Sequence, residues 1–130
     1  MGTVIAIVGS RTYPKLELVK KFVEDLDDDV GIVTGGARGV DQAAEDAALP
    51  IGLSVQVIKA DWERYGRGAG MIRNTQIVKV ADEVVAFWDL KSRGTHDTIS
   101  KARAAGKPVH VVGPDGKTLE ATANKQQELF

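Results

Sequence analysis

The chain has 130 residues, 43% of them hydrophobic and 27% charged, which suits one globular domain with its own core. Its net charge of −1 gives no overall attraction to nucleic acid or to an anionic membrane. The absence of cysteine excludes disulfides and thiolate sites, and the two histidines argue against a histidine metal centre. The N-terminus lacks a basic signal region and no apolar run has membrane-spanning length, so we expect a cytoplasmic protein without a bound metal.

Apolar runs alternate with segments of helical periodicity. Residues 3–8 are apolar and β-branched, which predicts a strand buried on both faces. Pro14 suits the first turn of a helix with an apolar stripe at Leu16, Val19, Phe22, Val23 and Leu26. Further strands are predicted at residues 30–33, 54–60, 83–88 and 109–112, and further helices at residues 40–49, 71–81 and 95–105.

This alternation predicts an α/β fold, a three-layer Rossmann-like doubly wound parallel sheet. We expect five strands in the order 3-2-1-4-5, with the ligand crevice where strands 1 and 4 end. The domain is expected to span residues 1–113. Residues 114–130 are polar with few apolar positions, and we expect a weak helix or a partly disordered tail there.

A glycine-rich turn joins the second strand to its helix. It contains Gly35, Gly36, Ala37, Arg38 and Gly39. Backbone N–H groups at such a helix start form an anion site, and an arginine adds a forked donor, so the turn predicts phosphate binding. Asp41 follows in the first helical turn, either as a base or ribose ligand or as a partner of the helix dipole.

Two other strand ends should meet this turn at the same edge of the sheet. The first strand is followed by Gly9, Ser10 and Arg11, and the fourth by Trp88, Asp89, Gly94 and Thr95. Two helix starts facing one crevice can hold a phosphate or a diphosphate between them. Thr95 is a ligand contact or simply the N-cap of its helix.

The connection 61–70 adds aromatic and cationic side chains. Trp62 lies among arginines that include Arg64 and Arg67, so it either stacks on a base or covers the sheet edge. Arg73 and Asn74 come at the start of the next helix, and we expect both to face the ligand. The glycines match neither G-x-G-x-x-G nor a Walker motif, which disfavours an NTPase.

Four motifs in order give the sequence a family resemblance: GSR at 9–11, TGGARGVDQAAEDAA at 34–48, DWERYGRGAGMIRN at 61–74 and AFWD…SRGT at 86–95. Over residues 3–112 the chain resembles the SLOG superfamily, closest to the small bacterial and phage YspA/YpsA-like proteins. This resemblance implies a Rossmann-like domain, expected as a homodimer, that binds nucleotides or their derivatives at the strand ends.

Two cousin groups imply other functions. The Lonely Guy phosphoribohydrolases cleave nucleoside monophosphates with a glutamate that would align on Thr98 here, and their leading Pro-Gly-Gly is absent. The DNA-processing protein of natural transformation binds single-stranded DNA.

The first prediction is therefore a sensor or carrier of a nucleotide derivative of the NAD, ADP-ribose or nucleoside phosphate class, with no certain cofactor. The alternative is a hydrolase of an N-glycosidic or phosphoester bond, with Asp41, Asp89 or Asp97 as the acidic group. The second alternative is binding of single-stranded nucleic acid, suited by the aromatics and arginines of 61–73.

Overall fold

The computed structural model describes residues 2–121. The elements are, in chain order, β1 (Val4–Gly9), α1 (Leu16–Glu24), β2 (Gly31–Thr34), α2 (Val40–Ala48), β3 (Ser54–Val57), α3 (Trp62–Tyr65), the 3₁₀ turn η1 (Gly66–Gly68), α4 (Ala69–Val80), β4 (Glu83–Phe87), α5 (Arg93–Ala104), β5 (Val109–Val112) and β6 (Thr118–Ala121).

One sheet carries the order β3-β2-β1-β4-β5-β6, and the strands β1 to β5 run parallel to one another. This confirms the predicted α/β fold and the order of the first five strands. The register places Ile5 of β1 between Ile32 of β2 and Glu83 of β4. The carboxyl ends of β1, β2 and β4 therefore lie at one edge of the sheet.

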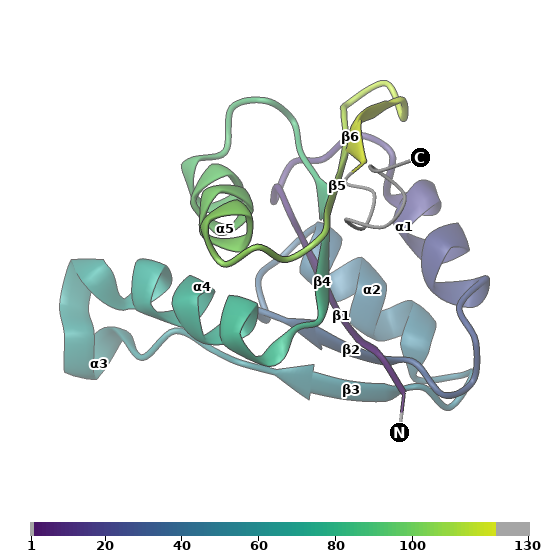
Figure 1. Cartoon of the computed structure of the whole chain (residues 1–130), viewed down its shortest axis with the longest axis horizontal. Helices are drawn as coiled ribbons and strands as arrows, with labels where there is room; N and C mark the ends of the chain where they lie inside the picture. Colours follow the sequence, from purple (N-terminus) through teal and green to yellow (C-terminus); the bar gives the residue numbers. More distant parts are fainter. Residues whose placement is uncertain (1, 122–130) are drawn as a thin grey trace.

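Helices cover both faces of the sheet, with α1 and α2 on one side and α4 and α5 on the other (Figure 1). Along β1, Ile5 and Ile7 pack under α1 and α2, while Ala6 and Val8 pack under α4 and α5. Because alternate side chains enter different cores, every residue of the strand has to be apolar. The two cores hold the strand ends, and the loops that follow them, in fixed positions.

The first helix begins later than predicted. Pro14 lies before it, Lys15 is the N-cap, and Leu16 at the first helical position is 38% exposed instead of buried. Leu18 packs against the core on this side. Val19 and Val23 are fully buried, as the periodicity predicted.

The connection 61–70 was predicted without helix, but α3, η1 and the first two residues of α4 lie within it. Asp61 caps α3, its Oδ1 accepting the N–H of Arg64 at 3.1 Å. In α4, Asn74, Ile77 and Val78 are buried, whereas Met71 is 57% exposed.

Residues 118–121, expected in a weak helix or disordered tail, form β6 instead, antiparallel to β5. The turn at Gly116, with a φ of 86°, brings the chain back along β5. The part of the tail prediction that concerns residues 122–130 lies outside the described residues. Within residues 2–121 no helix is long and apolar enough to cross a membrane.

Candidate nucleotide-binding site

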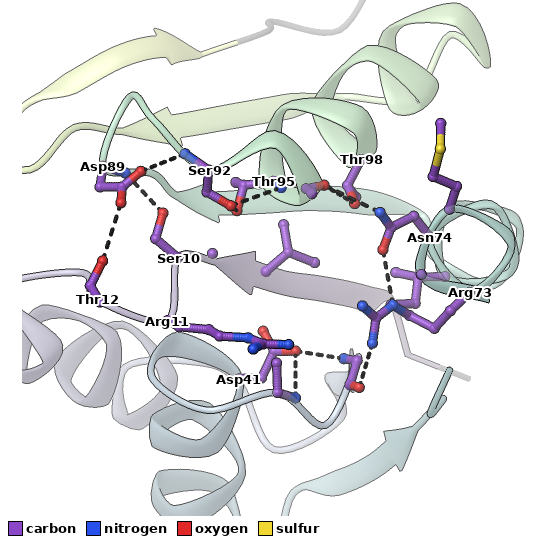
Figure 2. A pocket seen from close by; sticks show the side chains of 18 of the residues that line it. Ser10, Arg11, Thr12, Asp41, Arg73, Asn74, Asp89, Ser92, Thr95 and Thr98 are labelled. Atoms are coloured by element: carbon purple, nitrogen blue, oxygen red, sulfur yellow. Dashed lines mark hydrogen bonds between the residues drawn. The ribbon is translucent and has the colours of Figure 1, made fainter. Parts of the chain in front are cut away.

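A pocket of about 620 Å³ opens at the carboxyl edge of the sheet, where the crevice was predicted. Loops after β1, β2 and β4 form its floor, and α4 and the start of α5 form its walls (Figure 2). Of the residues singled out in the sequence, the structure brings into its lining Gly9, Ser10, Arg11, Gly35, Ala37, Asp41, Trp62, Arg73, Asn74, Asp89, Gly94 and Thr95.

The glycine-rich turn already holds an internal anion. Asp41 Oδ2 accepts the N–H groups of Gly35 at 3.0 Å and Ala37 at 3.1 Å (Figure 2). Two of the donors that we assigned to a ligand are thus used by the protein. Asp41 therefore shapes the turn, and it lies in the first turn of α2, where a carboxylate complements the helix dipole.

The carboxyl group of Asp41 is 5% exposed. Burial raises its pKa to about 6, against the lowering effects of the Ala37 and Gly35 N–H groups and of the Arg73 guanidinium. Asp41 consequently changes charge near neutral pH, directly beneath the pocket.

Arg73 is fixed by two hydrogen bonds. Its Nη1 donates to the Gly35 carbonyl at 2.7 Å, and its Nε donates to Asn74 Oδ1 at 2.9 Å. Burial lowers the pKa of Arg73, while the charge of Asp41 raises it. An arginine retains its proton under these conditions. The result is a half-buried, oriented cation on the pocket wall.

Asn74 joins α4 to α5. Its Nδ2 donates to the Gly94 carbonyl at 3.2 Å and to Asp97 Oδ2 at 3.1 Å. Thr98 Oγ1 donates to the same Gly94 carbonyl at 3.2 Å. These bonds explain why Asn74 and Thr98 are buried, and they fix the first turn of α5 at the pocket.

The helix α5 has a different cap from the one expected. Ser92 is the N-cap and its Oγ accepts the N–H of Thr95 at 3.3 Å, so the helix begins at Arg93. Thr95 is buried and lines the pocket, with its Oγ1 at 3.0 Å from Ser92 Oγ.

Asp89 organises the loop between β4 and α5. Its Oδ1 accepts the N–H groups of Lys91 and Ser92, both at 2.8 Å, and its Oδ2 accepts the Thr12 hydroxyl at 3.3 Å. Burial raises the pKa of Asp89, but these hydrogen bonds outweigh it and the pKa lies below the usual value. Leu90 in this loop has a φ of 71°, a conformation that non-glycine residues rarely adopt.

Five predicted residues lie outside the pocket lining: Gly36, Arg38, Gly39, Trp88 and Asp97. Trp88 Nε1 instead donates to the Ser92 carbonyl at 3.0 Å, and Asp97 forms an ion pair with Lys101 at 2.8 Å. Gly39 has a φ of 76°, and a Cβ built on it would lie 2.5 Å from the Arg11 carbonyl oxygen.

Sequence reasoning did not assign to the site several residues that line it: Val8, Thr12, Arg67, Gly70, Met71, Ile77, Lys91, Ser92 and Thr98. Lys91 and Ser92 lie between two predicted positions, Asp89 and Gly94, so the length of that loop was the available signal. Met71 and Gly70 depend on the start of α4, which the sequence placed too late.

The pocket wall is positively charged. Arg11, Arg67, Arg73 and Lys91 line it together with two carboxylates, which gives a net charge of +2 when both are ionised. Trp62 lines the same pocket with 56% of its surface exposed. Within residues 2–121 no three His, Asp or Glu side chains are grouped to hold a metal ion.

Comparison with known proteins agrees with this architecture. The chain is 39% identical over 84 residues to the gene 61 protein of Mycobacterium phage D29, covering 60% of this chain and 67% of that protein. DNA processing protein A from Streptococcus pneumoniae superposes with a TM-score of 0.73 at 24% identity, over 85% of this chain and 50% of that one. The chain thus spans half the length of the pneumococcal structure.

A second solved structure, DNA processing protein A from Helicobacter pylori, has a TM-score of 0.66 at 21% identity, over 98% of this chain and 71% of that one. Its description concerns the single-stranded DNA binding mode of that protein. These likenesses confirm the Rossmann-like fold. A family model described as DNA recombination-mediator protein A matches residues 1–66, half of the chain, and the chain therefore belongs to that family.

Proposed function

We propose that this protein binds single-stranded DNA and that the pocket at the carboxyl edge of the sheet holds one nucleotide of the strand. The observation that carries the proposal is the meeting of four cationic side chains and an exposed tryptophan in one pocket. Non-specific binding of single strands uses this combination, because cations follow the phosphates while an aromatic ring stacks on a base.

The cationic side chains of the pocket differ in how exposed they are, and this suggests different roles in binding DNA. Arg73 is oriented by Gly35 and Asn74, so it is suited to a phosphate in a defined position. Arg11 and Lys91 are exposed on the two loops that border the pocket, where they add attraction without fixed geometry. The net charge of −1 does not oppose this, because local charge at the pocket decides the attraction at short range.

The family model and one solved structure support DNA as the ligand over other polymers. The family carries DNA recombination in its description, and the Helicobacter pylori protein is described as binding single-stranded DNA. Both statements concern other proteins, and the proposal extends them to this chain.

A free nucleotide derivative, the first prediction from the sequence, is the second candidate. The pocket volume of about 620 Å³ is within the range of small-ligand sites, roughly 300–1,000 Å³. The cytoplasmic location and the homodimer also stay predictions.

One titration tests both candidates. Fluorescence anisotropy of a labelled oligothymidylate should give saturable binding, with weaker binding of the matching duplex. Thymidine monophosphate, NAD and ADP-ribose are added as competitors. If one of these competes at far lower concentration than the unlabelled oligonucleotide, the free nucleotide is the ligand.

Exposed variants keep the test independent of folding. Arg11→Gln and Lys91→Gln should each weaken oligonucleotide binding by roughly tenfold, the loss of one hydrogen bond to a charged group. Arg103→Gln removes a charge from the far end of α5 and should leave binding unchanged. An oligonucleotide that fails to bind the folded wild-type protein at low salt would refute DNA binding.

A further inference from the structure

A second cavity of about 250 Å³ lies on the other side of α4 from the larger pocket, bordered by α3 and by the segment that follows β3. It is lined by Lys59, Arg64 and Arg73, with Asp61 as its carboxylate and Tyr65 as its aromatic ring. Three cations against one carboxylate give this small cavity a net charge of +2. The binding of one nucleotide in the larger pocket does not involve this second cavity.

The single carboxylate is already engaged. Asp61 Oδ1 caps α3 by accepting the N–H of Arg64 at 3.1 Å. Within residues 2–121 neither Lys59 nor Arg64 forms an ion pair. Arg64 lies over the ring of Tyr65, its Cζ at 5.2 Å from the ring centroid, and this contact helps to orient the guanidinium.

Arg73 lines both cavities and is therefore their common wall. Its Nε and one Nη1 hydrogen are committed to Asn74 and Gly35. A guanidinium has five N–H donors, and within the described chain no hydrogen bond involves Nη2. The remaining donors can serve an anion from either side.

Lys59 lines the second cavity and lies close to Gly36 of the glycine-rich turn. A Cβ built on Gly36 would lie 3.3 Å from Lys59 Cγ, so the lysine side chain lies next to the glycine-rich turn. Gly36 is exposed and has no side chain. The cations of the two cavities are thus linked through Arg73, which lines both.

We propose that the second cavity binds the phosphate of the adjoining nucleotide of a single DNA strand, so that the strand crosses α4 at Arg73. This inference rests on the proposed function, because the first nucleotide must occupy the larger pocket. A strand with two phosphates engages both cavities, whereas a mononucleotide or inorganic phosphate engages one.

The test compares ligands that differ in the number of phosphates. Calorimetry or fluorescence titration is carried out with thymidine 5′-monophosphate, the 5′-phosphorylated thymidine dinucleotide, a longer oligothymidylate and inorganic phosphate. The variant is Lys59→Gln with Arg64→Gln, both exposed side chains. The matched control is Lys20→Gln with Lys79→Gln, which removes the same charge from exposed positions that line neither cavity.

We expect the double variant to bind the dinucleotide and the oligothymidylate at least roughly tenfold more weakly and the mononucleotide as wild type does. The slope of log K against log salt for the oligothymidylate should become less negative by about 0.7 for the lost phosphate contact. The matched control should change neither quantity to this extent.

Three outcomes would overturn the inference. Equal binding of all ligands by the double variant and wild type removes the second cavity from the DNA path and leaves the proposed function standing. Equal weakening of mononucleotide and oligonucleotide makes the cavity part of the first site. Wild-type protein that binds none of the nucleotides refutes the proposed function and the second site together.

Discussion

Asp41 and Arg73 hold the two polar groups of a single residue, Gly35. Asp41 Oδ2 accepts the Gly35 N–H at 3.0 Å, and Arg73 Nη1 donates to the Gly35 carbonyl at 2.7 Å. A Cβ at Gly35 would lie 2.6 Å from Nη1 and 3.0 Å from Oδ2, so only glycine fits between them. A buried acid and a half-buried base are thus linked through one backbone unit at the floor of the pocket.

The first prediction concerns Asp41 and pH. Burial raises its pKa from 3.8 to about 6. At a pH between these two values, Asp41 is protonated in the folded protein and ionised in the unfolded chain. The free energy of unfolding should therefore fall as pH rises from about 4 to about 6, by roughly 3 kcal/mol from this group.

The Asp41→Asn variant isolates this contribution, because other carboxylates titrate in the same range. Urea unfolding of both proteins at a series of pH values gives the difference curve. The variant should gain stability relative to wild type as pH rises through this window, and a flat difference curve would show that the pKa of Asp41 is unshifted.

The second prediction concerns Arg73. Replacement by alanine leaves the Gly35 carbonyl and Asn74 Oδ1 without a donor and removes the positive charge beside Asp41, so we expect a loss of about 1–3 kcal/mol of stability as well as weaker DNA binding. Arg73→Lys retains the positive charge but cannot donate to the Gly35 carbonyl and to Asn74 Oδ1 with a planar guanidinium. It should therefore bind DNA better than Arg73→Ala and more weakly than wild type. Thermal unfolding and oligonucleotide titration of both variants separate the two effects; identical loss of binding in both variants would show that geometry, not charge, is what matters.

The third prediction concerns Trp62, which is 56% exposed at the pocket wall. Oligothymidylate should quench its fluorescence by stacking, and Trp62→Ala should weaken binding by about 1–3 kcal/mol. The other tryptophan, Trp88, is partly buried and bonded to the Ser92 carbonyl, so fluorescence of the Trp62→Ala variant should stay constant during the titration. Quenching that persists in the variant would place the bound strand elsewhere.

The fourth prediction concerns the hydrolase alternative. Thr98 occupies the position of the phosphoribohydrolase glutamate, and its hydroxyl is buried and bonded to the Gly94 carbonyl. Asp97 is held by Asn74 and Lys101, away from the pocket. With no free carboxylate at this helix start to stabilise a ribose cation, AMP incubated with the protein should release no adenine. Chromatography of long incubations checks this, and adenine that disappears in an Asp41→Ala or Asp89→Ala variant would establish the enzyme.

The sheet could be predicted from the sequence because parallel strands buried on both faces are apolar throughout. Residues 4–8 show this directly, and residues 109–112 are apolar apart from His110. Both segments form strands within one residue of the prediction. The strand β6 was not predicted because it lies at the edge of the sheet. Thr118 and Leu119 are exposed there, so the sequence shows no pattern of buried apolar residues.

The site could be predicted at the level of loops, since the carboxyl ends of β1, β2 and β4 must meet. The hydrogen-bond partners of each polar side chain could not be predicted. The same Asp41 carboxylate fits a ligand contact or an internal bond, and only the structure shows its 3.0 Å hydrogen bond with Gly35. Likewise, Ser92 and Thr95 are both suitable caps, and the choice depends on where the backbone of α5 turns.

Gly39 connects the two loops that flank the larger pocket without using a side chain. A Cβ there would lie 2.5 Å from the carbonyl oxygen of Arg11 and 2.7 Å from that of Ser10. The loop after β1 and the turn after β2 therefore lie in close backbone contact at this position. Any side chain at residue 39 would have to push the two loops apart, and so would widen the mouth of the pocket between Arg11 and Asp41.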